Sequence, residues 1–351
     1  MTATGLRVRF DKALQEFLRG AMPALAGIAD DLGPLAEATE AFVLDGGKRL
    51  RPLFCYWGYR ATGAGDDERI VAAAASLELL QACALVHDDV IDGSDTRRGA
   101  PSVHRRFAAL HRSAGWHGDP ERFGQAAAIL LGDLALIWAD AMLSGSGFTA
   151  VELERALPIW DTMRVEVMCG QYLDVVEQAR GGGSVERALR VARFKSAKYT
   201  IERPLHLGAA LGAGPPELST AFSAYGLPLG EAFQLRDDVL GVYGDPDVTG
   251  KPAGDDLREG KRTVLVAYAL EAANDAQTEQ LRRHLGDPQL AEDGITVLRE
   301  IIAATGALDR VEELISVRAA AAGRALDDVV MDAEARSALL QLAEAASRRL
   351  V

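Results

Sequence analysis

The chain is patterned for helices along most of its length. Apolar side chains recur at spacings of three and four residues, as on one face of an amphipathic helix, whereas the alternation typical of strands is scarce. Glycine-rich breaks such as Gly46-Gly47 and Gly181-Gly182-Gly183 separate the periodic stretches. The pattern predicts helices at 6–20, 33–44, 50–62, 67–93, 121–143, 149–179, 185–211, 215–243, 262–272, 275–285, 288–304, 307–326 and 332–350.

The order of these segments favours a single all-α domain that covers residues 1–351. We find no clean strand, no repeat of 20–50 residues and no low-complexity linker. Two stretches, 95–120 and 244–261, are rich in glycine, proline or aspartate and are expected to be irregular. Loops of that length in a compact domain often carry function.

Charge and composition restrict the function further. The 351 residues include 51 acidic and 38 basic side chains, so the net charge is −13, which disfavours non-specific binding of nucleic acid. No run of 18 apolar residues and no apolar signal segment is seen, so we expect a cytoplasmic protein without membrane insertion. Cys55, Cys83 and Cys169 are too few and scattered for a disulfide framework, and all three are expected to be buried, reduced thiols.

Two acidic clusters carry the strongest chemical signal. Asp88 and Asp92 end an apolar helix and, four residues apart, share one of its faces. Their mutual repulsion, and the negative end of the helix dipole, favour a bound cation, and oxygen-only ligands suit Mg²⁺. Asp237-Asp238 ends another apolar helix. Two such helix ends, facing one cavity, could hold a diphosphate through Mg²⁺ ions.

Basic residues stand where a bound anion would need them. Gly46-Gly47-Lys48-Arg49-Leu50-Arg51-Pro52 forms a turn between two predicted helices, and Arg97-Arg98 follows the first acidic cluster. Further lysines, Lys251 and Lys261, follow the second cluster. Arginine suits bidentate phosphate contacts, and lysine meets phosphate as a point charge.

These segments resemble the trans-isoprenyl diphosphate synthases, the polyprenyl synthetase family that includes farnesyl and geranylgeranyl diphosphate synthases. The resemblance runs from about residue 40 to residue 265, and its further motifs are Gly170-Gln171, Lys195-Ser196-Ala197, Phe233-Gln234 and Gly250-Lys251. It implies an isoprenoid synthase-type helical bundle around a central cavity, usually a homodimer. It also implies head-to-tail condensation of isopentenyl diphosphate with an allylic diphosphate.

The resemblance also implies a role for individual side chains. Isopentenyl diphosphate would be bound by Lys48, Arg51, Gln81 and Arg98. Mg²⁺, three ions per active site, would be bound by Asp88, Asp92 and Asp237. The allylic diphosphate would be held by Arg97, Lys195 and Lys251, and the reacting centre lined by Gln171, Ser196 and Gln234. Asp255 and Lys261 are weaker assignments near the metal and the phosphates.

The chain departs from the family pattern at three positions. Gly241 stands where many members have a third aspartate in the second motif, Gln81 where many bacterial members have histidine, and Ser196 where threonine is usual. Two alternatives stay open at this point. A class I terpene cyclase shares the fold but needs no second diphosphate site, and a non-catalytic subunit of a heteromeric synthase typically loses an acidic motif.

Product length depends on the helix that ends in Asp88. Cys83 and Ala84 lie one turn before it and are both small, whereas bulky aromatic residues there close the cavity at C15 in the family. We therefore expect C20 geranylgeranyl diphosphate as the product. Farnesyl or longer-chain diphosphate synthase remains the alternative.

Overall fold

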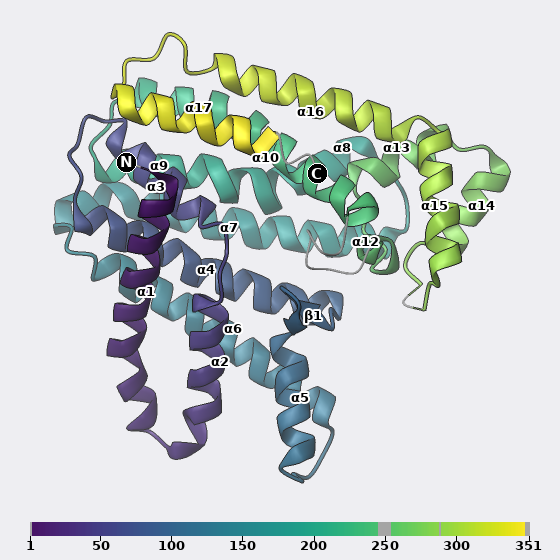
Figure 1. Ribbon diagram of the computed structural model, residues 1–351, viewed down its shortest axis with the longest axis horizontal. Helices are drawn as coiled ribbons and strands as arrows, with labels where there is room; N and C mark the ends of the chain where they lie inside the picture. The colour runs from purple at the N-terminus through teal and green to yellow at the C-terminus, as the bar shows by residue number, and fades with distance from the viewer. Residues whose placement is uncertain (1, 245–253, 288, 348–351) are drawn as a thin grey trace. The chain divides into compact units, whose positions relative to one another are not determined.

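The computed structural model describes residues 2–244, 254–287 and 289–347 and consists almost wholly of helices (Figure 1). Within these ranges the strands are limited to β1 (Thr96–Arg97) and β2 (Ala100–Pro101), which pair as a short antiparallel hairpin. The prediction of an all-α fold is confirmed.

The chain divides into two compact units, of which the first comprises Met1–Ala156 and Leu207–Ala213. Besides the hairpin, it contains η1 (Asp30–Leu32), α1 (Ala3–Ala26), α2 (Gly33–Leu44), α3 (Leu50–Arg60), α4 (Glu68–Asp92), α5 (Val103–Ser113) and α6 (Pro120–Ser144). The helices α7 (Ala150–Arg180) and α9 (Arg203–Leu211) each contribute residues to both units. Whether the chain acts as a single domain stays a prediction.

Helix α4 is the centre of the first unit and packs against α1, α3 and α6. Asp67 caps its first turn by accepting from the Arg69 backbone N–H, and Gly93 ends it with a φ of +68°, a conformation that favours glycine. Its first half is buried on nearly every side, as its Ala and Leu content predicts. From Gln81 onward one face is partly exposed, and that face carries Asp88 and Asp92.

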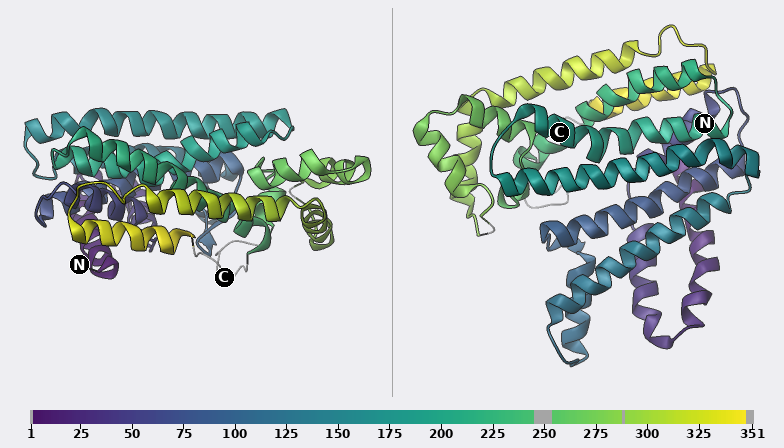
Figure 2. Two further views of the ribbon diagram at one scale, coloured as in Figure 1. Left: turned by 90° about the horizontal axis from the view of Figure 1, so that it is seen from above. Right: turned by 180° about the vertical axis from the view of Figure 1, so that it is seen from behind.

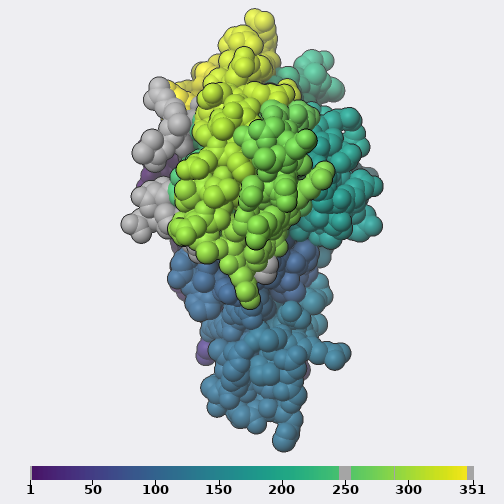
Figure 3. Space-filling model, turned by 90° about the vertical axis from the view of Figure 1, so that its right-hand side faces the viewer, coloured from purple at the N-terminus to yellow at the C-terminus, as the bar shows by residue number. Residues whose placement is uncertain are grey.

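The second unit comprises Leu157–His206 and Gly214–Val351. Its helices, apart from α7 and α9, are α8 (Val185–Val191), η2 (Ala192–Glu202), α10 (Pro216–Tyr243), α12 (Asp255–Arg258), α13 (Val264–Ala272), α14 (Asp275–His284), α15 (Glu292–Ala304), α16 (Ala307–Arg324) and α17 (Ala333–Ser347). Helix α10 packs against η2, α16 and α17, and two further views show α16 and α17 running alongside it (Figure 2). In the space-filling view, α13, α14 and α15 form one continuous light-green surface (Figure 3).

Three predicted segments differ from the structure. The stretch 244–261, predicted to be irregular, contains helix α12, and its residues 245–253 lie outside the described residues. Helix α5 lies inside the stretch 95–120, which was expected to be irregular; its apolar side pairs Phe107 with Phe123 of α6. The predicted helix 185–211 is continuous in extent but changes type, because η2 is a π-helix between two α-helices. Pro204 is a local reason, since it lacks the N–H that would bond the carbonyl of Thr200 and its ring crowds that carbonyl.

One sequence expectation about exposure needs correction. Cys169 on α7 is exposed, whereas Cys55 and Cys83 are buried as expected. Two helices, α4 and α6, are long and apolar enough to cross a membrane, although no run of 18 purely apolar residues exists. In the most apolar 18-residue stretch of α4, 72% is buried inside the protein, as is typical of a core helix. In the corresponding stretch of α6, 44% is buried.

Candidate active site

One face of α4 carries a line of predicted site residues. Gln81, Ala84, Asp88 and Asp92 follow one another at intervals of three or four residues, and all four are half-buried on a helix whose other positions are mostly buried. Cys83 points elsewhere: it is fully buried, and its Sγ lies 3.8 Å from Nδ1 of His87. Burial raises the pKa of the Cys83 thiol to about 12. The two residues predicted to limit chain length therefore occupy different environments.

The β1–β2 hairpin places two arginines beside the end of α4. Its two-residue turn, Arg98-Gly99, has positive φ at both positions (55° and 77°), the geometry of a tight hairpin turn. Arg97 is thereby brought to Asp89, which is fully buried and accepts from the arginine Nε at 2.9 Å. Arg97 Nη2 also lies 3.9 Å from a carboxylate oxygen of Asp88. Arg97 thus stands beside the predicted metal ligands.

Arg98 reaches the opposite way, to the C-terminal end of α2. Its Nη1 donates to the carbonyl of Asp45 at 2.6 Å, and its guanidinium lies 5.6 Å from the ring centroid of Phe42. The Gly46-Gly47 turn begins at that helix end, and a Cβ on Gly47 would lie 3.6 Å from Arg98 Nη2. The structure therefore brings Arg98 to the turn that carries the exposed Lys48.

Arg49 holds this turn in place, a role that the sequence analysis did not assign. Its backbone has a positive φ of 51°, and its buried guanidinium donates to Asp11 at 2.8 Å, to Glu78 at 2.8 Å and to the carbonyl of Val43 at 2.9 Å. Removing one partner of a buried ion pair costs about 3–5 kcal/mol. Arg49 thus fixes the neighbouring Lys48 in the first unit.

The second acidic motif lies at the end of α10, in the second unit. Asp237 is half-buried there, as is Gln234 three residues earlier, whereas Asp238 is buried and accepts from Gln234 Nε2 at 2.8 Å. Burial, together with the charges of Asp256 and Asp237, raises the pKa of Asp238 to about 8. The end of α10 is anchored by Arg236, which makes a two-pronged ion pair with Glu312 at 2.6 and 2.7 Å.

Asp256 belongs to this cluster and was missed in the sequence. Its carboxylate lies over Gly241, close enough that a Cβ at position 241 would be 2.5 Å from the Asp256 Cγ. Lys261 Nζ donates to Asp256 at 3.2 Å and lies 2.6 Å from Glu259. The glycine that departs from the family pattern therefore makes room for a carboxylate from α12.

Lys195 and Ser196 lie in η2, also in the second unit. Lys195 Nζ donates to Asp174 of α7 at 2.7 Å, and Ser196 is buried. Gln171 is half-buried on α7, three residues before Asp174. Asp174 had no assigned role, although it follows the Gly170-Gln171 motif. Lys251 lies outside the described residues.

The residues present fit Mg²⁺ in their chemistry. Among residues 2–244, 254–287 and 289–347, no three His, Cys, Asp or Glu side chains converge closely enough to hold a metal unaided. Asp88 and Asp92 offer only oxygen ligands, and Asp237 and Asp238 add two more carboxylates at the end of α10. Mg²⁺ commonly keeps several waters and adds substrate phosphate oxygens, so a partial set of protein ligands is what it needs.

Comparisons with known proteins agree with this chemistry. The profile of the polyprenyl synthetase family matches residues 33–302. The chain is 33% identical over 285 residues to geranylfarnesyl diphosphate synthase of Aeropyrum pernix, covering 79% of this chain and 82% of that protein. It is 32% identical over 270 residues to geranylgeranyl diphosphate synthase of Saccharolobus solfataricus, covering 76% of each.

Solved structures show the same relationship. The crystal structure of geranylgeranyl pyrophosphate synthase from Corynebacterium glutamicum, complexed with isoprenyl diphosphate and magnesium, is 45% identical in sequence. It superposes with a TM-score of 0.97 over 100% of both chains. The expected resemblance and fold are confirmed: the chain belongs to the polyprenyl synthetase family and is a trans-prenyltransferase.

Proposed function

We propose that the protein catalyses the Mg²⁺-dependent head-to-tail condensation of isopentenyl diphosphate with an allylic diphosphate, and that its main product is C20 geranylgeranyl diphosphate. The observation that carries this proposal is the half-buried face of α4, on which Asp88 and Asp92 follow Gln81 and Ala84. Carboxylates at one end of that face suit a metal-bound diphosphate, and the small side chain of Ala84 one turn earlier leaves room for a growing chain.

The reaction begins with heterolysis of the allylic C–O bond, whose electron pair leaves with the diphosphate. When bound, Mg²⁺ neutralises charge on the departing diphosphate. Lys195 and Lys251 would add cationic donors for the same oxygens. The double bond of isopentenyl diphosphate attacks the allylic cation, and a proton is then lost to the released diphosphate. We propose three Mg²⁺ ions, held by Asp88, Asp92 and Asp237.

Isopentenyl diphosphate needs a separate anion site, for which the first unit supplies a compact group. Lys48 is exposed on a turn that Arg49 fixes, and Arg98 is bound to the same end of α2. Arg51 and Gln81 would complete the set. A preorganised cationic turn binds phosphate at a lower entropic cost than mobile surface side chains would.

We further propose a homodimer. On α6 three large apolar side chains remain exposed in one chain, Ile129 at 46%, Leu130 at 62% and Ile137 at 63%. Leu130 and Ile137 are two turns apart on one helix face, which suits burial against the same helix of a second copy. Light scattering should give twice the chain mass, and Leu130→Asp should give monomers. A monomeric wild type would contradict this part of the proposal.

The function is tested by product analysis with radiolabelled isopentenyl diphosphate and Mg²⁺, using dimethylallyl, geranyl and farnesyl diphosphates as separate primers. We expect label in a C20 product from each primer that is accepted. A C15 or C25 end product would correct the chain length alone. Diphosphate release from the allylic substrate without isopentenyl diphosphate would instead indicate a cyclase, and no release at all would indicate a non-catalytic subunit.

A further inference from the structure

The segment that carries Lys195 has an unusual backbone. Helix η2, Ala192–Glu202, is an eleven-residue π-helix, whereas π-helical geometry normally occurs as single-turn bulges, often at functional sites. The wider helix shifts every following side chain around the axis relative to an α-helix. A segment of this kind persists only where its surroundings hold it, so the contacts around η2 determine where Lys195 points.

The neighbouring helices meet the backbone of η2 at glycines. A Cβ on Gly170 of α7 would lie 2.7 Å from the Cα of Lys195, and a Cβ on Gly230 of α10 would lie 2.5 Å from the Cα of Ala197. Both distances are shorter than side chains tolerate. The π-helix is therefore in direct backbone contact with α7 and α10 on either side of Lys195.

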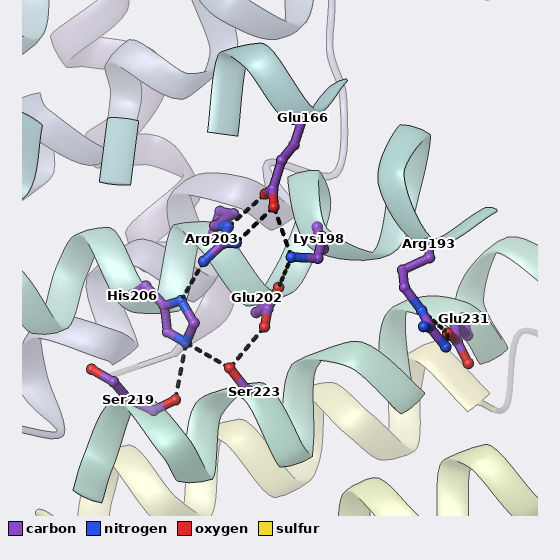
Figure 4. Close-up of polar contacts among 9 residues, drawn as sticks. All are labelled: Glu166, Arg193, Lys198, Glu202, Arg203, His206, Ser219, Ser223 and Glu231. Carbon is purple, nitrogen blue, oxygen red and sulfur yellow. Dashed lines mark hydrogen bonds and ion pairs between the residues drawn. The ribbon is translucent and has the colours of Figure 1, made fainter. Parts of the chain in front are cut away.

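A half-buried ionic cluster joins η2 to α7 (Figure 4). Glu166 of α7 accepts from Lys198 Nζ at 2.7 Å, and from Nε and Nη2 of Arg203 at 2.6 and 2.7 Å. Although burial opposes it, hydrogen bonds from Arg203 and Lys198 leave the pKa of Glu166 below its usual value. Glu166 thus binds the middle of η2 and the residue after its end.

The cluster continues to α10 through the hydroxyl of Ser223 and the backbone carbonyl of Ser219. Glu202 lies 3.5 Å from Lys198 Nζ and accepts from the hydroxyl of Ser223 at 2.7 Å. Arg203 donates to Nδ1 of His206 at 3.3 Å, so Nε2 of the neutral ring donates to the carbonyl of Ser219 at 3.0 Å (Figure 4). Two carboxylates, Glu166 and Glu202, thus face two cations, so their charges are compensated within the cluster.

Three positions of α7 set the register between the two helices. Glu166, Gly170 and Asp174 follow one another at intervals of four residues and share a face of α7. Glu166 binds Lys198, Gly170 lies against the backbone of Lys195, and Asp174 binds the ammonium of Lys195. We infer that Glu166, acting through Lys198 and Arg203, is a positioning residue that sets where the Lys195 ammonium stands. This inference rests on the proposed role of Lys195 in binding the allylic diphosphate.

The test compares Glu166→Gln with a matched control on the same helix. Glu177→Gln also removes a carboxylate that is bound by two cationic side chains, here Arg180 and Arg187, but these do not lie in η2. Glu166→Gln should raise the apparent KM for the allylic diphosphate about tenfold, because a small displacement of a binding group weakens its contacts. The apparent KM for isopentenyl diphosphate should stay within about twofold of the wild-type value. Glu177→Gln should leave the ratio of the two constants unchanged.

A second variant pair separates charge from shape. Lys198→Met should reproduce the effect of Glu166→Gln, and Lys198→Arg, which keeps a cation facing Glu166, should restore the ratio towards that of the wild type. The inference would be overturned if Glu166→Gln raised both KM values equally. It would also be overturned if Lys198→Arg changed the ratio of the KM values as much as Lys198→Met does. Either result would mean that the cluster has only a structural role.

A readout without catalysis separates this inference from the proposed function. Amide hydrogen exchange of peptides within 192–202 should accelerate in Glu166→Gln and not in Glu177→Gln. Unchanged exchange would show that Glu166 does not hold η2, whatever the kinetics. A wild-type protein that consumes neither diphosphate would refute the proposed function, and with it the inferred role of Glu166, while exchange would still decide whether Glu166 holds η2.

Discussion

The carboxylate of Asp256 occupies the space that a side chain at Gly241 would need, with its Cγ 2.5 Å from the position of a Cβ there. Lys261 Nζ donates a hydrogen bond to that carboxylate at 3.2 Å. The position of the Asp256 side chain therefore depends on the absence of a side chain at Gly241.

Gly241→Ala should therefore lower the free energy of unfolding by about 1–3 kcal/mol, as overpacking at a filled site does. Asp256→Ala removes the colliding carboxylate, so the double variant should lose less than the two single variants added together. Urea unfolding of the four proteins measures this. Strictly additive losses would show that the two positions do not share this space.

His206 provides a pH-dependent contribution to stability. Burial lowers its pKa below the usual 6.5, so the neutral form is the one that the fold accepts. The stabilisation is complete above about pH 6.5, the pKa of the unfolded chain, and is lost as the pH falls towards the lower folded pKa. The advantage of wild type over His206→Gln in unfolding free energy should thus shrink from about pH 7 to pH 5. An advantage that grows on acidification would contradict this.

Chain length should respond to bulk before the first acidic pair. Ala84→Phe places a ring on the half-buried face that carries Asp88 and should shift the product towards C15. Cys83→Phe should act in the same direction, but it must displace His87 and should also cost about 1–3 kcal/mol of stability. Chromatography of the products measures both. If both variants still make the wild-type product, α4 does not limit chain length.

The two diphosphates should be separable by lysine variants. Lys48→Ala should raise the apparent KM for isopentenyl diphosphate more than that for the allylic substrate, because the turn that carries Lys48 lies with Arg98 in the first unit. Lys195→Ala should have the opposite selectivity. Steady-state kinetics with each substrate varied in turn will show which assignment holds, and a reversed pattern would exchange the two sites.

Helix periodicity predicted most of the fold, and its failures have physical causes. The segments 67–93 and 215–243 match α4 and α10 to within a residue at each end. Long apolar stretches specify both helices, Asp67 caps the start of α4, and Pro216 begins α10. Helix α5 was missed because Gly99, Pro101 and Gly115 flank it closely, although the apolar pattern within it is helical.

Site residues could be predicted only where they stand in a recognisable local sequence motif. Asp88 and Asp237 stand in recognisable patterns, but the partners that orient the site do not. Glu166, Asp174 and Asp256 are ordinary acidic residues in the sequence, and their roles follow from pairing across helices that local patterns do not encode. The π-helix η2 could not be predicted from local patterns either, because its backbone contacts glycines of two other helices, Gly170 of α7 and Gly230 of α10.

The carboxylate pair of α4 is the most direct test of the whole account. Turnover of isopentenyl diphosphate with an allylic primer and Mg²⁺ should fall by about 10²–10³-fold or more in Asp88→Ala and in Asp92→Ala, with helical content unchanged by circular dichroism. Asp95→Asn is the matched control, because Asp95 lies three residues further along and pairs with Arg105 instead. Near-wild-type turnover in either alanine variant, with Mg²⁺ present, would contradict the assignment of this face as the metal and diphosphate site.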